Sequence, residues 1–423
     1  EPMIQTIPLF PEITLRCCRD PRFKQGCLSL QLIRPMQAEE NAMNALLPAV
    51  LLRGTQAHPD IRTITQRLDE LYGASVSPVV RRVGDYQTTG LYCGFMDDRF
   101  ALPGDRVLEP MMAFLEELLL ESPLEKGGFL PAFVESEKKN LISAIESELN
   151  DKRAYAMKCL LRAMCREDSF GLSRLGEPRQ VADIDPVELY QHYRKILRES
   201  PIELFYVGSA QPEQVAQLLR PLLARLERAP IPRLPQTGFH SCPGQTLSEA
   251  MEVSQGKLCM GFTTPITNRD PEFPAMQVLN TLFGAGMTSK LFMVIREQMS
   301  LCYSIGSGYY GSKGIVTVSA GIDFDKEALT AQEVLHQLEK CRQGQITQEE
   351  LTAARQALLS GLRATHDSPS AIEGYYATAA LSGMGMTPQQ YMQAVEAVTM
   401  EDVVAAARSL QLHTTFFLKG ADQ

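Results

Sequence analysis

An internal repeat is the feature of this sequence that most constrains its fold, because a duplicated unit predicts two domains of similar architecture. Residues 181–190 precede a predicted helix and then a short apolar strand at 202–208. Residues 395–404 likewise precede a helix and then a strand at 415–420. In both copies an Asp or Thr stands where it can cap the helix, and the strand ends at a glycine. We therefore expect two related halves.

The earlier parts of the two halves correspond less sharply. Residues 67–76 and 296–305 both have the pattern of a helix, a turn and the start of a strand. Strand candidates follow at 86–95 and 314–322, and both show the alternation expected of a half-buried antiparallel strand. The strand at 86–95 is also a candidate exposed edge, on which an extended peptide adds by backbone pairing.

A proline-rich segment separates the halves. Three prolines lie between residues 228 and 238, where they oppose helix and stiffen the chain. We expect an N-terminal domain over 1–227, a linker over 228–240 and a C-terminal domain over 241–423, because 423 residues exceed one ordinary core. Strands interleaved with helix pairs predict an α+β fold, in which each domain has a mostly antiparallel sheet with helices packed on one face.

Composition and charge exclude several classes of function. The net charge of −9 disfavours nucleic-acid binding, which needs clustered Lys and Arg. The longest apolar run, at 45–52, is interrupted by Pro48 and is far shorter than the ~20 residues of a membrane span. A P-loop is not expected at 284–286, because the Lys-Ser/Thr ending is missing.

The ten cysteines form no CxxC pair, and most lie in apolar stretches. Buried free thiols in a reducing compartment are the simplest interpretation, so we expect a cytoplasmic protein. No charged-then-apolar leader precedes Pro8, and we therefore expect no signal peptide.

Several segments together resemble one known family. Residues 42–55, which end in Arg53-Gly-Thr, look like the helix that carries the inverted zinc motif HxxEH of the pitrilysin/insulinase-type metallopeptidases, which include the mitochondrial processing peptidase. Residues 68–76 and 84–89 also resemble this family, and residues 284–304 carry the strongest likeness. The resemblance covers nearly the whole chain and implies the two-domain half of a clamshell.

The zinc ligands themselves are absent. Counted back from Arg53-Gly-Thr, the motif positions hold Ala45, Pro48 and Ala49, which offer neither imidazole nor carboxylate. A peptidase zinc site needs two imidazoles one helical turn apart, a distal carboxylate and a Glu that activates water. The distal region 135–140 keeps carboxylates, but these alone hold zinc poorly. We expect no catalytic residue, no metal and no cofactor in this chain.

A second element of the family is retained. In family members that act as paired subunits, an Arg and a Tyr hold the substrate backbone, and by resemblance these are Arg296 and Tyr303. An Arg offers a fork of donors to peptide carbonyls, and a Tyr hydroxyl can donate to an oxyanion. Without the resemblance, the simpler interpretation is that Arg296 is a solvated helix residue and that Tyr303 covers the hydrophobic core.

The resemblance implies a non-catalytic subunit of a zinc metalloendopeptidase-type complex. Its partner would be a zinc-bearing HxxEH chain of the same family, and the two would enclose an unfolded peptide or pro-segment. The zinc would belong to the partner, and the sequence leaves open whether the isolated chain pairs with a second copy of itself. Two other interpretations stay open: a purely structural core-type subunit, and a stand-alone peptide-binding protein.

Overall fold

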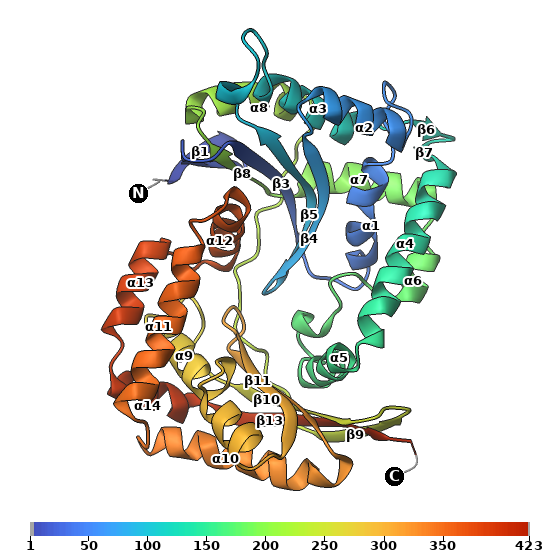
Figure 1. The fold of residues 1–423 in the computed structure, drawn as a ribbon. Helices are drawn as coiled ribbons and strands as arrows, with labels where there is room; N and C mark the ends of the chain where they lie inside the picture. The colour runs from blue at the N-terminus through green and yellow to red at the C-terminus, as the bar shows by residue number, and fades with distance from the viewer. Residues whose placement is uncertain (1–3, 422–423) are drawn as a thin grey trace. The chain divides into compact units, whose positions relative to one another are not determined.

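The computed structural model describes residues 4–421, and Figure 1 labels their elements. In the first half of the chain the strands are β1 (Ile4–Phe10), β2 (Ile13–Arg19), β3 (Gln25–Pro35), β4 (Ser75–Val83), β5 (Tyr86–Met96), β6 (Leu124–Glu125), β7 (Gly128–Phe129) and β8 (Ile202–Gly208). Its helices are α1 (Asn41–Leu51), α2 (Ile61–Glu70), η1 (Asp98–Phe100), α3 (Leu108–Leu120), α4 (Pro131–Asn150), α5 (Lys152–Met164), η2 (Ser169–Gly171), α6 (Pro178–Ala182), α7 (Pro186–Glu199) and α8 (Pro212–Ala224).

The second half repeats this mixture. Its strands are β9 (Thr246–Met251), β10 (Gly256–Thr263), β11 (Cys302–Tyr310), β12 (Ile315–Ile322) and β13 (Gln411–Gly420). Its helices are α9 (Phe273–Asn280), the π-helical turns η3 (Thr281–Ala285) and η4 (Leu291–Gln298), η5 (Phe324–Lys326), α10 (Glu327–Arg342), α11 (Gln348–Ala364), α12 (Pro369–Ser382), α13 (Pro388–Ala397) and α14 (Met400–Ser409).

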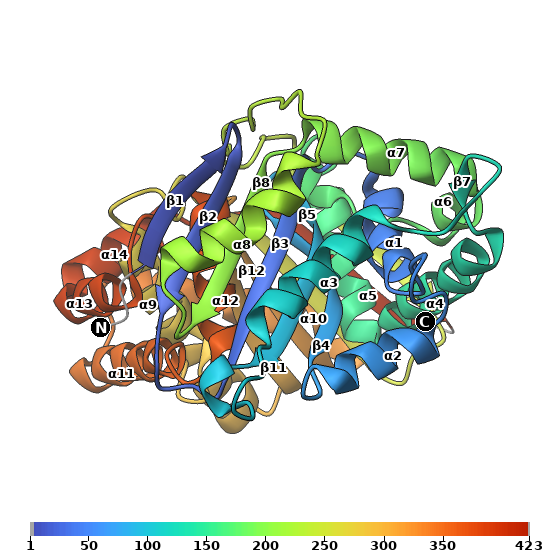
Figure 2. The ribbon, with the colours of Figure 1, turned by 90° about the horizontal axis from the view of Figure 1, so that it is seen from above.

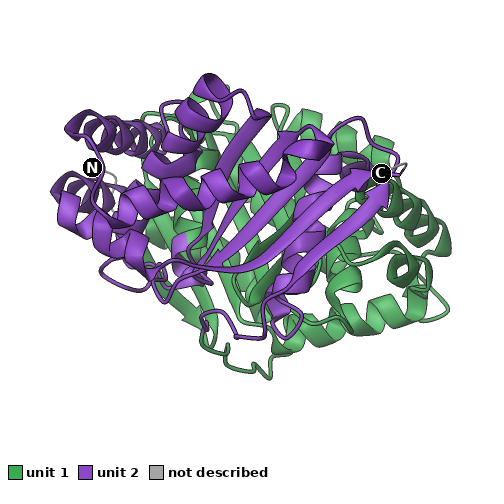
Figure 3. Cartoon of the chain, turned by 90° about the horizontal axis from the view of Figure 1, so that it is seen from below, with its two compact units in different colours: residues 1–146, 172–235, 366–378 green, residues 147–171, 236–365, 379–423 purple. Residues whose placement is uncertain are grey.

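The chain forms two compact units, coloured in Figure 3. The described residues of unit 1 lie within 1–146, 172–235 and 366–378, and those of unit 2 within 147–171, 236–365 and 379–423. The cut between 235 and 236 falls in the predicted linker. A single cut at the linker does not reproduce the two units, because each half of the sequence contributes one helical segment to the unit of the other half.

The sheet of unit 1 has the strand order β1-β2-β8-β3-β5-β4. Strands β2 and β8 pair in parallel, and the other neighbours pair antiparallel. Helices α3 and α8 lie over one face of this sheet, as Figure 2 shows. Every side chain of β8 is buried, and so is every side chain of β3 except those of its first and last residues. Because successive side chains point to opposite faces, the face away from α3 and α8 must be covered as well.

Helix α12 supplies this second cover. Its Ile372 packs against Cys18, Cys27 and Val207, which lie on β2, β3 and β8. The α+β class and the mostly antiparallel sheets are confirmed, but the expectation that helices cover one face only is wrong in unit 1. Sequence periodicity within the first half cannot reveal a helix that arrives from residue 369 onward.

A buried carboxylate holds α12 to the sheet. Glu373 is 1% exposed and accepts two hydrogen bonds of 2.8 Å from the guanidinium of Arg81 on β4. Its Oε1 also accepts from the Ser29 hydroxyl at 2.7 Å and from the Gln31 amide at 3.4 Å. Three strand side chains thus compensate one desolvated charge, as buried ions require.

The sheet of unit 2 has the order β11-β12-β10-β13-β9, in which β13 and β9 pair in parallel. Helix α5, from the first half of the sequence, packs on this sheet through Leu160, which lies among Cys259, Phe416 and Leu418. Gly261 allows the close approach, because a Cβ there would lie 2.5 Å from the sulfur of Met164 on α5.

A fully buried ion pair fastens the chain just beyond α5. Lys313 Nζ lies 3.0 Å from Asp168 Oδ2, and neither side chain is exposed. The same carboxylate accepts from the backbone N–H groups of Phe170 and His240. Asp168 thereby joins the loop after α5 to the β11–β12 turn and to the start of unit 2 after the linker.

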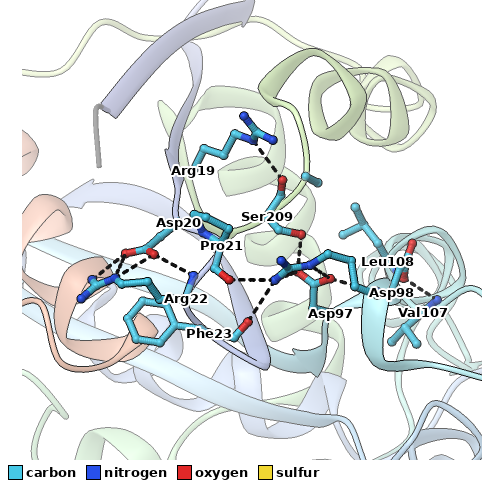
Figure 4. A network of polar contacts seen from close by, with 12 residues as sticks. Arg19, Asp20, Pro21, Arg22, Phe23, Asp97, Asp98, Val107, Leu108 and Ser209 are labelled. Atoms are coloured by element: carbon cyan, nitrogen blue, oxygen red, sulfur yellow. Dashed lines mark hydrogen bonds and ion pairs between the residues drawn. The ribbon is translucent and has the colours of Figure 1, made fainter. Parts of the chain in front are cut away.

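A repeated Asp-x-Arg-Phe motif closes one end of the first sheet (Figure 4). It occurs at 20–23 and at 97–100, and in each copy the aspartate accepts from the backbone N–H and the guanidinium of the arginine two residues later. Burial acts to raise the pKa values of Asp20 and Asp97, but these hydrogen bonds outweigh it and both pKa values lie below the ordinary range.

The repeated helix-to-strand unit is present in both halves. Asp185 caps α7, which leads into β8, and Thr399 caps α14, which leads into β13. Strand β5, however, lies between β3 and β4, so the predicted edge at 86–95 is wrong. The edge is β4, because β5 pairs with β4 on one side and with β3 on the other.

All ten cysteines are free, and all but Cys159 are buried. Burial raises the pKa of most of these thiols, for example that of Cys93 to about 12, so they behave as small apolar side chains. Within residues 4–421 no helix is long and apolar enough to cross a membrane.

Replacing Glu373 by Gln tests the anchor of α12. The amide cannot accept from both arginine nitrogens, so we expect the free energy of unfolding to fall by about 2 kcal/mol. Urea denaturation followed by circular dichroism measures this. The exposed Glu396→Gln is the matched control and should change stability by less than about 0.5 kcal/mol. Equal stability of the two variants would contradict the anchoring role.

Candidate functional site

Helix α1 carries the three positions where the resemblance places zinc-site residues. Ala45 and Pro48 are buried, and Ala49 is half-buried. The helix packs on β5 and β4 and contacts α6 and α7. The side chains at these three positions pack against the neighbouring elements and offer no metal ligand atom.

Pro48 is accommodated by a specific hydrogen bond. A proline inside a helix has no N–H, so the carbonyl four residues earlier loses its partner. That carbonyl belongs to Asn44, and it accepts instead from the hydroxyl of Thr89 on β5 at 2.6 Å. The helix thus crosses the former motif position without an unsatisfied buried carbonyl.

Buried amides surround this point. The side chain of Asn44 donates to Gln87 Oε1 at 3.0 Å and receives the ring N–H of His192 at 2.7 Å. Gln87 in turn donates to the carbonyls of Asn41 and Arg174. These groups satisfy one another, and they lock α1 to β5 and α7.

The remaining imidazole near the motif helix is kept neutral. Burial lowers the pKa of His192 to about 4, although the charge of Glu40 acts in the opposite direction. Its Nε2 is bonded to Asn44, so the ring is a structural hydrogen-bond donor and is not free to bind metal.

The retained distal carboxylates are neutralised by cations. Glu137 lies on α4 and pairs with Arg53 at 2.9 Å, and the Arg53 guanidinium lies 5.8 Å from the ring centroid of Phe133. Glu135 pairs with Lys138 on the same helix. In the described part of the chain no group of three or more His, Cys, Asp and Glu side chains could hold a metal ion. The residues present do not fit a peptidase zinc.

Arg296 and Tyr303 are brought together in unit 2. Arg296 lies on η4 and donates from Nε to the backbone carbonyl of Tyr303, at the start of β11, at 3.0 Å. The guanidinium also lies over the ring of Phe292, with 4.8 Å to the centroid. Two π-helical turns precede β11, and such turns are frequent at functional sites.

Arg296 is half-buried and Tyr303 is exposed, and both have acidic neighbours. Tyr303 is 55% exposed and donates its hydroxyl proton to Asp323 at 2.8 Å, which raises the pKa of Tyr303. Arg296 forms an ion pair with Glu297 through Nη1, which leaves Nη2 without a hydrogen bond to any described residue. The arrangement offers a guanidinium donor and a phenol oxygen that still accepts.

Other residues of these regions were not anticipated. Asn44, Thr89 and His192 gave no sequence signal, because each is an ordinary polar residue whose partner is distant in the chain. Arg153, on α5, donates from Nη2 to the Ser304 hydroxyl on β11 at 3.4 Å. Only the folded unit shows that this residue of the first half stands beside Ser304.

Comparisons with known proteins agree with this geometry. Residues 183–358 match the family described as Peptidase M16 inactive domain. The chain is 28% identical over 410 residues to the probable inactive metalloprotease YmfF of Bacillus subtilis, covering 97% of this chain and 96% of that protein.

Solved structures share the fold over the whole chain. A conserved protein from Enterococcus faecalis V583 superposes with a TM-score of 0.91 at 24% identity over 99% of both chains. A peptidase M16 inactive domain from Pseudomonas fluorescens gives a TM-score of 0.81 at 16% identity, over 99% of this chain and 98% of that one.

The fold and the site define a metallopeptidase-like protein whose motif helix has no ligand atoms. The chain is similar to the pitrilysin/insulinase-type M16 peptidases, and its helix α1 carries no HxxEH motif.

The neutral state of His192 predicts a pH dependence of stability. Its pKa is about 4 in the fold and 6.5 in the unfolded chain, so the unfolded state binds more protons between these values. The contribution of neutral His192 to the free energy of unfolding is therefore fully present above pH 6.5. It falls by up to roughly 3 kcal/mol as the pH drops toward 4. Urea titrations at several pH values measure this, and His192→Gln should remove that part of the slope. An unchanged slope would contradict it.

Proposed function

We propose that this chain is the non-catalytic subunit of a zinc metalloendopeptidase-type pair. It binds an extended peptide or pro-segment and presents it to a zinc-bearing HxxEH chain of the same family. The observation that carries the proposal is the contrast between the zinc-motif positions on α1 and the Arg296–Tyr303 pair in unit 2. Ala45, Pro48 and Ala49 only pack against their neighbours, whereas Arg296 and Tyr303 lie adjacent, with Arg296 half-buried and Tyr303 exposed.

The chemistry of each element supports this division of roles. Zinc peptidases need imidazole ligands and a Glu that activates water, and Ala45, Pro48 and Ala49 provide neither. A partner must supply the metal, and this chain contributes donors only. Arg296 Nη2 is available to a peptide carbonyl, because the other guanidinium nitrogens are already bonded within the chain.

Tyr303 would act on the same peptide in a limited way. Its proton is directed to Asp323, so its oxygen accepts from a peptide N–H more readily than it donates to an oxyanion. Exposure of 55% lets the hydroxyl exchange partners when substrate arrives. Binding and positioning are therefore the main contribution of this pair.

One observation favours a second candidate, a purely structural subunit. Glu297 and Asp323 already satisfy much of the hydrogen-bonding capacity of Arg296 and Tyr303, as expected if these side chains only stabilise their own unit. The two candidates differ in what the loss of Arg296 does to a reconstituted peptidase. For location we propose the cytoplasm, on the ten free thiols.

Substituting Arg296 by Ala tests the binding role. With a zinc-bearing partner and a fluorogenic peptide, we expect kcat/KM to fall about tenfold, the loss of one charge-assisted hydrogen bond. The exposed Arg363→Ala is the matched control and should leave kcat/KM unchanged. Wild-type rates for Arg296→Ala, with the complex intact by mass, would favour the structural subunit.

The metal content of the isolated chain provides a separate test. Because Arg53 neutralises Glu137 and no imidazole is free at the motif helix, we expect far less than one zinc per chain after dialysis against zinc. Inductively coupled plasma mass spectrometry measures it. Stoichiometric zinc together with peptide cleavage by the purified chain alone would overturn the proposed function.

A further inference from the structure

The outer edge of strand β11 is open. β11 spans Cys302–Tyr310 and is the last strand on its side of the unit 2 sheet. It pairs with β12 from Cys302 to Tyr310, with one irregularity between Cys302 and Ser304. Within residues 4–421 no other strand or loop pairs its backbone with residues 304–309. Alternate N–H and C=O groups along this segment are therefore free to pair with another chain.

The other edges of the two large sheets carry features that prevent strand addition. β4 contains Pro78 and the charged pair Arg81-Arg82, and β1 contains Pro8 with a register shift beside it. β9 has only six residues, one of them Glu249. Prolines, charges, bulges and short length are the usual protection of edges. β11 has nine residues with neither a proline nor a charged side chain, and its one register irregularity lies at its start, so the edge from Ser304 onward is unprotected.

The charges beside this edge specify the occupant further. Arg153 reaches the Ser304 hydroxyl and forms no ion pair with any described carboxylate. Arg296 lies at the same end of the strand, bonded to the Tyr303 carbonyl. Two guanidinium groups thus flank the first residues of β11, and only Arg296 has a carboxylate partner, Glu297. A carboxylate on an incoming chain would complement the unpaired charge of Arg153.

We propose that the edge of β11 binds an extended peptide as an added strand, with a carboxylate of that peptide on Arg153. The occupant is a peptide of alternating β-forming residues with one Asp or Glu opposite the start of the strand. The inference deepens the proposed function, because it names the class of peptide and the strand that holds it. Backbone pairing gives affinity and Arg153 gives the preference for an acidic residue.

The backbone pairing is tested with modified peptides. The probe is a fluorescein-labelled peptide of alternating threonine and valine with one central glutamate, titrated with the isolated chain and followed by anisotropy. Two derivatives carry N-methyl groups on either set of alternate amides. An added strand uses only one set, so we expect one derivative to bind about tenfold more weakly and the other to bind like the parent. Equal binding of both derivatives, or no binding of the parent, would overturn the proposal.

The role of Arg153 is tested by a double-mutant cycle. We expect Arg153→Gln to weaken binding of the glutamate peptide about threefold to tenfold and to leave unchanged the binding of the peptide in which glutamine replaces glutamate. Arg363→Gln, an exposed arginine of the same unit, is the control and should bind both peptides as the wild type does. Equal effects of Arg153→Gln on the two peptides would refute the carboxylate contact.

These experiments are independent of the zinc-bearing partner. If Arg296→Ala loses activity but the two N-methyl derivatives bind equally, the proposed function is supported and the β11 site is refuted. If only one N-methyl derivative binds weakly and Arg296→Ala keeps full activity, the β11 site is supported and the substrate-binding role of Arg296 is refuted.

Discussion

Buried ionised groups hold the two exchanged helical segments, and the architecture of both units depends on them. Glu373 binds α12 to the first sheet through Arg81, Ser29 and Gln31. Asp168 binds the loop after α5 to Lys313 with both side chains fully buried. Apolar contact alone is not directional and would tolerate a helix shifted by one turn. A desolvated charge has few acceptable partners, so a shifted helix would leave it uncompensated.

The exchange also explains how each sheet is covered. β3 and β8 are buried on both faces because a helix from the other half of the sequence lies on the second face. In unit 2, α5 fills the corresponding role over β10 and β13, and Gly261 leaves room for Met164. A chain cut at the linker would take from each sheet a helix that shields apolar side chains, so each half of the sequence depends on the other.

At helix α1, the positions that the resemblance assigns to a metal site lie within a framework of satisfied polar groups, and no group of described residues around them could hold a metal ion. Thr89 replaces the hydrogen bond that Pro48 removes, Asn44 and His192 satisfy each other, and Arg53 neutralises Glu137. Every one of these changes is locally consistent, and an unpartnered carboxylate or carbonyl would have been costly in this buried region. In unit 2, by contrast, Arg296 and Tyr303 stay at the surface beside an open strand edge.

Residue identity and local periodicity are enough to predict the duplication and the α+β class, and to show that Ala45, Pro48 and Ala49 carry no ligand atoms. Three features become visible only once the chain is folded: β4 and not β5 is an edge, α12 covers the first sheet, and Arg153 stands beside Ser304. Strand order and the partners of buried charges join residues that are distant in the sequence, and no local pattern records such pairings.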